Sequence, residues 1–197
     1  MNEYNPAKAR NLMQLSFCYT FEEINDEVFC AYTVPYTYSA VLAHLKQLKL
    51  LSTGIAKHTN LGSSLGGINI PLLKISNNFC DLKPIIVIIG RQHPGETHSS
   101  FIIHGFINHI MSTNPLANKF RDFFETWILP VVNPDGVVCG NYRSNLQGKD
   151  MNRCFYADGD QLAKSRCYEV ELLREKLKQT FKARKFKMFL DIHSHSS

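Results

Sequence analysis

Residues Ile85-Ile86-Val87-Ile88-Ile89 form an unbroken aliphatic run, and this run restricts the fold more than any other feature. A strand without polar alternation is typical of a sheet that is covered on both faces. A second buried strand is predicted at 126–132 and a last one at 186–192, with helices at about 99–110 and 162–181. Strands that alternate with helices predict an α/β fold, with a mixed, largely parallel sheet and helices on both faces.

The first eighty or so residues carry weaker patterns. Alternating apolar residues at 13–21, a polar turn and a second apolar segment at 28–32 predict a short β hairpin, which is too small to be stable alone. Ser39 is a suitable cap for a helix that carries Val41, Leu42, Leu45 and Leu48 at helical spacing. Two weak strands follow between glycines, and the second is predicted at 68–75.

Composition excludes several classes of protein. The hydrophobic fraction of 44% and the charged fraction of 20% are those of a globular domain. The net charge of +5 comes from scattered Lys and Arg residues, so nucleic-acid binding is not expected. No apolar signal core or membrane span is present, and the six cysteines include no C-x-x-C pair. We therefore expect a cytoplasmic protein with reduced thiols, no membrane partner and no disulfide framework.

Candidate metal ligands follow two of the predicted buried strands. His93-Pro94-Gly95-Glu96 comes after the first strand, and Asp191-Ile192-His193 ends the last. In open α/β sheets ligands bind at the carboxyl edge, so these residues are expected to meet there. Pro94 keeps His93 out of helical conformation and places Glu96 in the first turn of the next helix. Two histidines and a glutamate suit a catalytic Zn²⁺ with one open position for water, so we predict one zinc at His93, Glu96 and His193.

The alternative interpretation is that these are ordinary caps or surface groups. The spacing H-x-x-E is common by chance, and His193 after another strand is what favours a metal site. His98 and His195, each two residues from a predicted ligand, are interpreted as surface groups or as groups that orient a ligand. The remaining histidines are interpreted as groups without partners and without a metal. They are His44, His58, His104 and His109.

The central and C-terminal segments resemble a known family. The cytosolic branch of the zinc metallocarboxypeptidases typically carries H-P-G-E, N-P-D-G-V, G-N-Y-R, G-x-D-L-N-R and D-x-H-G-H-S in this order. The matching segments here are 93–96, 133–137, 140–143, 148–153 and 191–196, and residues 32–38 resemble the branch's entry into its catalytic domain. Met151 replaces the usual Leu and Ser194 the usual Gly, and neither change removes a functional side chain. Two histidines and a glutamate are also the ligands of carboxypeptidase A.

The resemblance implies roles for further residues. Asn152 and Arg153 resemble the pair that binds the substrate's terminal carboxylate, for which a guanidinium fork is well suited. Arg143 resembles the residue that stabilises the oxyanion, and Asp150 the carboxylate that orients His93. The alternative is that both arginines are surface residues. Asp135 is interpreted as a turn former.

The implied reaction is hydrolysis of C-terminal peptide bonds in proteins or peptides. The branch removes glutamates from C-termini and from polyglutamate side chains on tubulin and other proteins, which also implies an association with microtubules or cilia. The net charge of +5 is compatible with an acidic substrate.

The resemblance also implies a chain truncated at both ends. Residues 1–35 are expected to be the tail of an N-terminal β domain, and 36–197 the N-terminal part of the carboxypeptidase domain. The family's general base is a glutamate downstream of the third ligand, and Glu169, Glu171 and Glu175 are not suitable replacements because they precede it on an amphipathic helix. Three interpretations remain: a fragment of an active carboxypeptidase, a protein that binds zinc or polyglutamate without hydrolysis, and an aspartoacylase-like amidohydrolase. The intact segments at 133–137 and 150–153 argue against the third.

Overall fold

The computed structural model describes residues 15–51, 54–155 and 166–194. The chain divides into two compact units, residues 1–32 and 33–197. Within the described ranges, none of the helices has the length and hydrophobicity that a membrane span requires.

The predicted hairpin is not formed in the described part of the first unit. Residues 15–32 contain no strand, and residues 13–14 lie outside the described ranges. Leu15, Phe17 and Phe21 are largely exposed. A two-stranded hairpin is only marginally stable in water. Without burial of its apolar side chains, nothing offsets the conformational entropy that the chain would lose on forming the two strands. The prediction of an upstream β domain stays a prediction.

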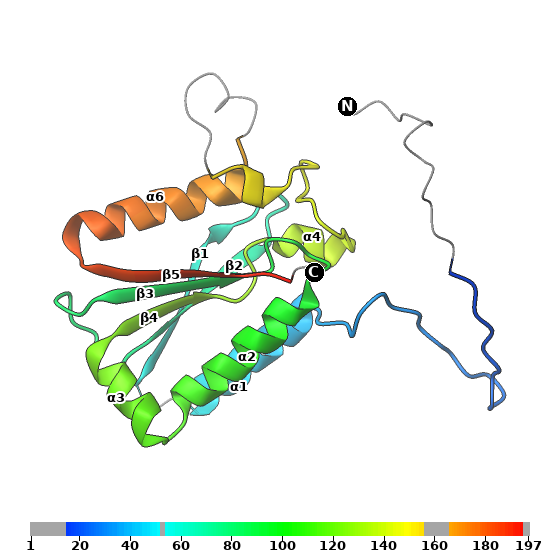
Figure 1. Cartoon of the computed structure of the whole chain (residues 1–197), viewed down its shortest axis with the longest axis horizontal. Coiled ribbons are helices and arrows are strands. Elements are labelled where there is room, and N and C mark those ends of the chain that lie inside the picture. The colour runs from blue at the N-terminus through cyan, green and yellow to red at the C-terminus, as the bar shows by residue number, and fades with distance from the viewer. Residues whose placement is uncertain (1–14, 52–53, 156–165, 195–197) are drawn as a thin grey trace. The chain divides into compact units, whose positions relative to one another are not determined.

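The second unit is an α/β fold with a five-stranded sheet in the order β1-β2-β4-β3-β5 (Figure 1). The strands β3 (Ile85–Gly90), β4 (Glu125–Leu129) and β5 (Phe186–Ile192) are parallel. The strands β1 (Ala56–Ser63) and β2 (Asn69–Ile75) form an antiparallel pair, and β2 is antiparallel to β4. The predicted mixed, largely parallel sheet is confirmed, with its parallel part formed by the three strands from residue 85 onward.

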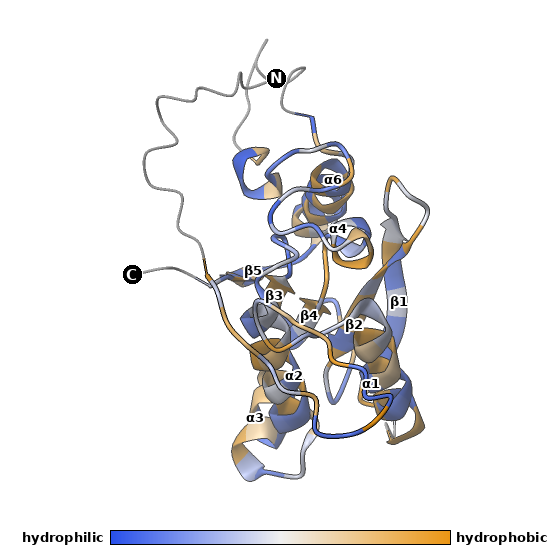
Figure 2. Cartoon of the chain, turned by 90° about the vertical axis from the view of Figure 1, so that its right-hand side faces the viewer, coloured by the Kyte–Doolittle hydropathy of each residue, from blue (hydrophilic) through white to orange (hydrophobic). Residues whose placement is uncertain are grey.

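Helices cover both faces of the sheet. The helices α1 (Tyr38–Leu51) and α2 (Thr97–Met111) lie on one face, and α6 (Tyr168–Ala183) lies on the other (Figure 1). Both hydrophobic and hydrophilic residues occur along these helices, as expected for helices with one buried side (Figure 2). Helix α6 begins at Tyr168, later than predicted, and residues 162–165 lie outside the described ranges.

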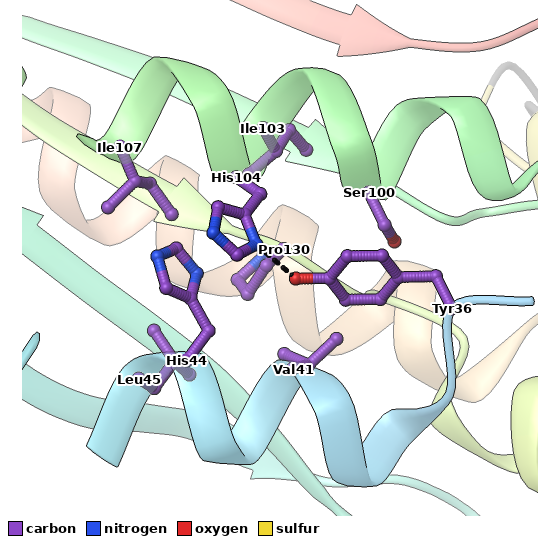
Figure 3. Close-up of a pocket in the computed structure, with 9 residues that line it drawn as sticks. All are labelled: Tyr36, Val41, His44, Leu45, Ser100, Ile103, His104, Ile107 and Pro130. Atoms are coloured by element: carbon purple, nitrogen blue, oxygen red, sulfur yellow. Dashed lines mark hydrogen bonds between the residues drawn. The ribbon is translucent and has the colours of Figure 1, made fainter. Parts of the chain in front are cut away.

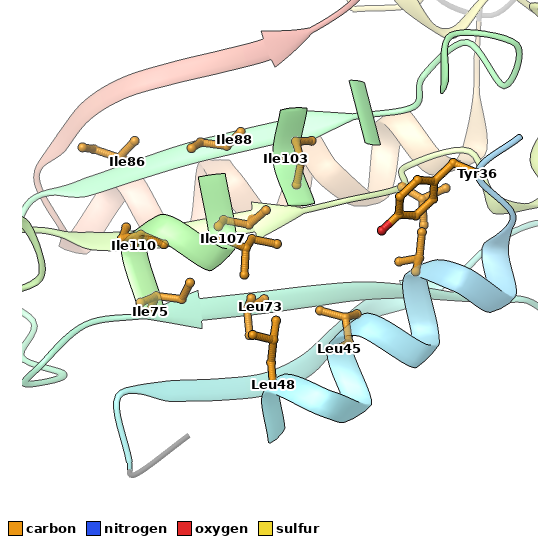
Figure 4. Packing of buried hydrophobic residues seen from close by; sticks show 13 residues of the cluster. Tyr36, Leu45, Leu48, Leu73, Ile75, Ile86, Ile88, Ile103, Ile107 and Ile110 are labelled. Atoms are coloured by element: carbon orange, nitrogen blue, oxygen red, sulfur yellow. The ribbon is translucent and has the colours of Figure 1, made fainter. Parts of the chain in front are cut away.

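Strand β3 lies between the two hydrophobic clusters. Ile86 and Ile88 pack with α1 and α2 (Figure 4). Ile85, Val87 and Ile89 belong to the other cluster, which contains residues of α6. All six residues of β3 are buried, as the aliphatic run predicts. Alternation along the strand thus supplies both faces of the sheet.

Strand β5 differs from the prediction of a buried strand. It occupies the edge of the described sheet and pairs with β3 alone, so Phe186, Met188 and Leu190 stay partly exposed. Its direction is nevertheless parallel to β3, so both strands end at the same edge of the sheet.

Within the described ranges, two α-helices were not predicted from the sequence. Helix α3 (Pro115–Phe123) and the short α4 (Pro134–Cys139) each begin with an Asn-Pro pair. In both, the asparagine side chain accepts a hydrogen bond from a backbone N–H of the first turn, and proline stands at the first helical position. The Asn-Pro pairs are local signals that could have revealed both helices.

Candidate active site

The parallel strands bring the predicted site residues to one edge of the sheet. The segment with His93 and Glu96 follows β3, and His193 follows β5 directly. The segment 130–153 follows β4 and carries Arg143, Asp150 and Asn152. Their meeting is therefore a consequence of strand direction.

His93, Glu96 and His193 converge with short contacts. His93 Nδ1 lies 2.7 Å from Glu96 Oε1, and His193 Nδ1 lies 2.9 Å from Glu96 Oε2. One ligand atom from each residue lies within 4.8 Å of the others. His93 and Glu96 are buried and His193 is partly buried. These residues form a group of metal-ligating type.

The donor atoms fit a cation. His93 Nε2 lies 2.9 Å from the Asp150 carboxylate, which requires a hydrogen on Nε2. A neutral His93 therefore presents the Nδ1 lone pair to the carboxylate of Glu96. Such a contact is favourable only with a proton or a cation held between the groups. Nitrogen and oxygen ligands in this combination suit Zn²⁺.

The glutamate is held in its ionised form. Burial acts to raise the pKa of Glu96, but the hydrogen bond from the backbone N–H of Ser194 and the close imidazoles of His93 and His193 outweigh it and lower the pKa. The Asp191 carboxylate, 2.9 Å from Nε2 of His193, raises the pKa of that histidine, against burial, which lowers it.

Asp150 connects His93 to Arg143. One carboxylate oxygen accepts from His93 Nε2 and from the backbone N–H of Asn152, and the other lies 2.7 Å from Nε of Arg143. Burial acts to raise the pKa of Asp150, but the hydrogen bonds from His93 and Arg143 lower it below its ordinary value. The carboxylate also caps the 3₁₀ helix η2 (Met151–Arg153), which fixes the start of the segment with Asn152 and Arg153.

A cavity of about 380 Å³ joins these groups. Asn152 is half-buried, and Arg143 and Arg153 are exposed at its rim. The structure therefore brings every sequence-predicted site residue except Asp150 to the wall of one cavity, with Asp150 directly behind His93 and Arg143. The lining residues are His93, Glu96, Tyr142, Arg143, Asn152, Arg153, His193 and Ser194.

Two glycines allow the loops of the site to approach each other. A Cβ on Gly95 would lie 2.4 Å from the ring of Tyr142, and the Gly95 N–H donates to the Tyr142 carbonyl. A Cβ on Gly136 would lie 2.4 Å from Pro94 and 2.8 Å from the carbonyl of Ser144. Only glycine fits at these close approaches.

Two buried carboxylates make contacts that were missed or misread from the sequence. Asp135 is not merely a turn former, because its buried carboxylate accepts from the Ser64 hydroxyl at 2.6 Å and from the Gly66 N–H at 2.8 Å. Buried Glu169 accepts from the side chain of Asn145, in the loop of Arg143 and Asp150. The sequence gives no local sign of these contacts. The partners of Asp135 are about 70 residues away in the chain, and the partner of Glu169 lies in a separate loop.

Two histidines interpreted from the sequence as groups without partners do have partners in the structure. His44 stacks on His104 with 3.5 Å between ring centroids, and its Nε2 lies 2.8 Å from Asn108 Oδ1. His104 Nδ1 lies 2.6 Å from the Tyr36 hydroxyl (Figure 3). Helices α1 and α2 bring these rings together, which single-sequence spacing does not reveal. His98 is exposed, and His195 lies outside the described residues.

The glutamates of α6 lie apart from this cavity. Glu171 and Glu175 line a separate surface pocket with Arg174 and Lys178, and Glu169 is engaged by Asn145. Among the described residues that line the candidate site, Glu96 is the one carboxylate.

Residues 41–197 match the family described as zinc carboxypeptidase. The chain belongs to this family. It is 34% identical to cytosolic carboxypeptidase 1 of Danio rerio over 96% of its length, and 35% identical to cytosolic carboxypeptidase 6 of Mus musculus over 93%. It spans 17% and 34% of those two proteins.

Solved structures agree with the family assignment. The metallo-carboxypeptidase from Burkholderia cenocepacia aligns with a TM-score of 0.69 and 30% identity, over 82% of this chain and 42% of that one. Carboxypeptidase A from Helicoverpa armigera aligns with a TM-score of 0.61 at 23% identity, which supports the fold alone. The predicted membership of the zinc carboxypeptidases is confirmed.

Replacing Asp150 with asparagine is expected to weaken zinc binding at the His93, Glu96 and His193 group about 10- to 100-fold, the usual cost of losing a partner of a metal-bound histidine. Asparagine keeps the shape but loses the charge, and its amide N–H groups would oppose those of Arg143. Competition with a chromophoric chelator measures the effect. Glu171→Gln, on α6, is the control, and unchanged affinity in Asp150→Asn would contradict the role of Asp150.

Proposed function

We propose that this chain is the metal- and carboxylate-binding part of a zinc carboxypeptidase that hydrolyses C-terminal peptide bonds. One zinc would be held by His93, Glu96 and His193. The single observation that carries the proposal is one cavity that unites a His-Glu-His group with Arg143, Asn152 and Arg153. Family membership and the cytosolic carboxypeptidase relatives support it.

The side chains of the cavity suit an anionic peptide end. Arg153 and Asn152 offer a planar guanidinium and an amide donor next to each other, a combination suited to a terminal carboxylate. Arg143 lines the same cavity and is oriented by Asp150, so it would donate to the scissile carbonyl oxygen as negative charge develops there. The chemistry that a bound zinc supplies to such a site is Lewis-acid polarisation of a carbonyl and acidification of water.

Glutamate-rich C-termini, such as those of polyglutamylated tubulin, are the proposed substrates. The support is the branch-specific segments, the relatives named cytosolic carboxypeptidases, and the net charge of +5. A cytoplasmic location near microtubules or cilia is proposed on the same basis.

A peptide that ends in three glutamates tests the proposal. The zinc-loaded chain is expected to bind it at least about tenfold more tightly than the same peptide with an amidated C-terminus, because one charge-assisted contact is worth about that factor. Titration calorimetry measures both affinities. Equal affinities would contradict a site for terminal carboxylates. Mass spectrometry of the peptide then reports hydrolysis, and release of glutamate would contradict the interpretation as a protein that binds without hydrolysis.

Arg153→Lys is expected to weaken binding of the free-carboxylate peptide about tenfold and to leave the amidated peptide unaffected. Lysine keeps the charge but not the two parallel N–H donors of the fork. Arg174→Lys on α6 is the matched control, because Arg174 lies outside the cavity. An equal loss of affinity for both peptides would show that Arg153 does not bind the terminal carboxylate.

A further inference from the structure

Arg91 is a buried cation next to the candidate metal group. It follows β3, two residues before His93, and only 3% of its surface is exposed. Among the described residues, no carboxylate lies within ion-pair distance of its guanidinium. A buried charge without a counter-ion is costly unless its donors are satisfied, so its hydrogen bonds indicate why it is there.

The guanidinium binds the loop of the metal ligands. Nε and one terminal nitrogen both donate to the carbonyl of Pro94, at 3.1 and 2.8 Å. The other terminal nitrogen donates to the Tyr36 carbonyl at 2.8 Å and to the Ser100 hydroxyl at 2.9 Å. The guanidinium of Arg91 thus links the loop 93–96 to helix α2 and to the segment that precedes α1.

Pro94 is the decisive partner. Its carbonyl lies in the chain between His93 and Glu96, and its ring fits against Gly136 on the other side. Fixing this carbonyl fixes the turn that presents both ligands. Tyr36, one of the other partners of Arg91, is itself held in place. Its hydroxyl bonds to His104 (Figure 3), and its ring packs edge-to-face on Phe101.

The backbone of Arg91 does not explain the arginine. Its φ is +55°, in the left-handed region, where glycine would be less strained. A large side chain at such a position is retained for contacts that glycine lacks. Those contacts are the four hydrogen bonds of the guanidinium.

We propose that Arg91 is a positioning residue for the metal group, and that its guanidinium sets the geometry of His93 and Glu96 through the Pro94 carbonyl. The inference rests on the proposed zinc site. The competing account is that Arg91 stabilises the fold without influence on the metal. Arg121 provides the comparison, because it is also buried, at 5% exposure, and its guanidinium also binds backbone carbonyls, including that of Ser112, but it lies on α3 outside the site.

The experiment compares Arg91→Lys and Arg91→Met with Arg121→Lys and Arg121→Met. Zinc affinity is measured by chelator competition, the ligand field by the visible spectrum of the Co²⁺-loaded chain, and stability by urea unfolding. The Arg91 variants are expected to bind zinc about 10- to 100-fold more weakly, with a changed cobalt spectrum, and lysine is expected to retain more affinity than methionine. The Arg121 variants are expected to lose stability and to keep the wild-type zinc affinity and cobalt spectrum.

Wild-type affinity and spectrum in Arg91→Lys and Arg91→Met would overturn the inference, as would an equal loss of zinc affinity in the Arg121 variants. If the Arg91 variants do not fold, Ser100→Ala decides, because it removes one acceptor of the guanidinium. A smaller loss of zinc affinity in the same direction supports the inference, and no loss overturns it. Failure of the wild-type chain to bind zinc would instead reject the proposed zinc site.

Discussion

His93→Ala is expected to lower the zinc affinity of the chain by more than the roughly 10- to 100-fold loss expected for a partner that only orients a ligand. Alanine removes the Nδ1 ligand atom that faces Glu96, and it also leaves Asp150 without the imidazole to which it is hydrogen-bonded. The remaining glutamate and His193 provide an incomplete set for Zn²⁺. Chelator competition on the folded protein measures the affinity.

His98→Ala is the matched control for this prediction. His98 is an exposed histidine two residues after Glu96, so its replacement removes an imidazole from the same region without touching the group. The control is expected to bind zinc as the wild type does. Equal affinities for His93→Ala and the wild type would contradict the metal assignment.

Arg184→Met is expected to lower the free energy of unfolding by about 3 kcal/mol, which is the typical cost of removing one partner of a buried ion pair. Arg184 donates to Glu125 at 3.0 Å and to the carbonyls of Cys80 and Lys83, and both charged side chains are largely buried. Trp127 Nε1 donates to the other oxygen of Glu125. Methionine would remove the cation that bonds to the carboxylate at the start of β4. Urea unfolding measures the loss.

The same pair predicts the pH dependence of this effect. Burial acts to raise the pKa of Glu125, but the hydrogen bonds from Arg184 and Trp127 lower it below its ordinary value of 4.5. A lowered pKa in the folded state contributes stability that is present above pH 4.5 and lost as the pH falls through the folded value. The difference in unfolding free energy between wild type and Arg184→Met should therefore shrink below pH 4.5.

Lys178→Met separates this effect from a general loss of charge. Lys178 pairs with Glu175 at 3.2 Å on the surface of α6, where both side chains are exposed. An exposed pair of this kind is worth about 0–1 kcal/mol. A loss in Arg184→Met no larger than that in Lys178→Met would contradict the importance of the buried pair.

Much of the fold could be predicted from the sequence because its signals are local. The aliphatic run at 85–89 and the apolar spacing of Val41, Leu45 and Leu48 depend on neighbours within a few residues. These patterns predicted β3 and α1, and the alternation of strands and helices predicted the parallel part of the sheet. Strand direction then placed the candidate ligands at one edge.

The parts that were missed depend on contacts distant in the chain. The hydrogen bond of Asp135 to Ser64 spans 71 residues, and that of Arg91 to the Tyr36 carbonyl spans 55. Spacing within a motif carries no information on such partners. The hairpin predicted at 13–32 is absent from the described residues 15–32 for a different reason, because its alternating pattern is local but these residues do not bury their apolar side chains.

The most direct test of the account is a crystal structure of the zinc-loaded chain with anomalous data collected at the zinc absorption edge. One strong anomalous peak per chain is predicted within bonding distance of Nδ1 of His93, Nδ1 of His193 and the Glu96 carboxylate, with Asp150 still bonded to His93. No peak at this group, or a peak held by other residues of the chain, would contradict the assignment of the zinc site.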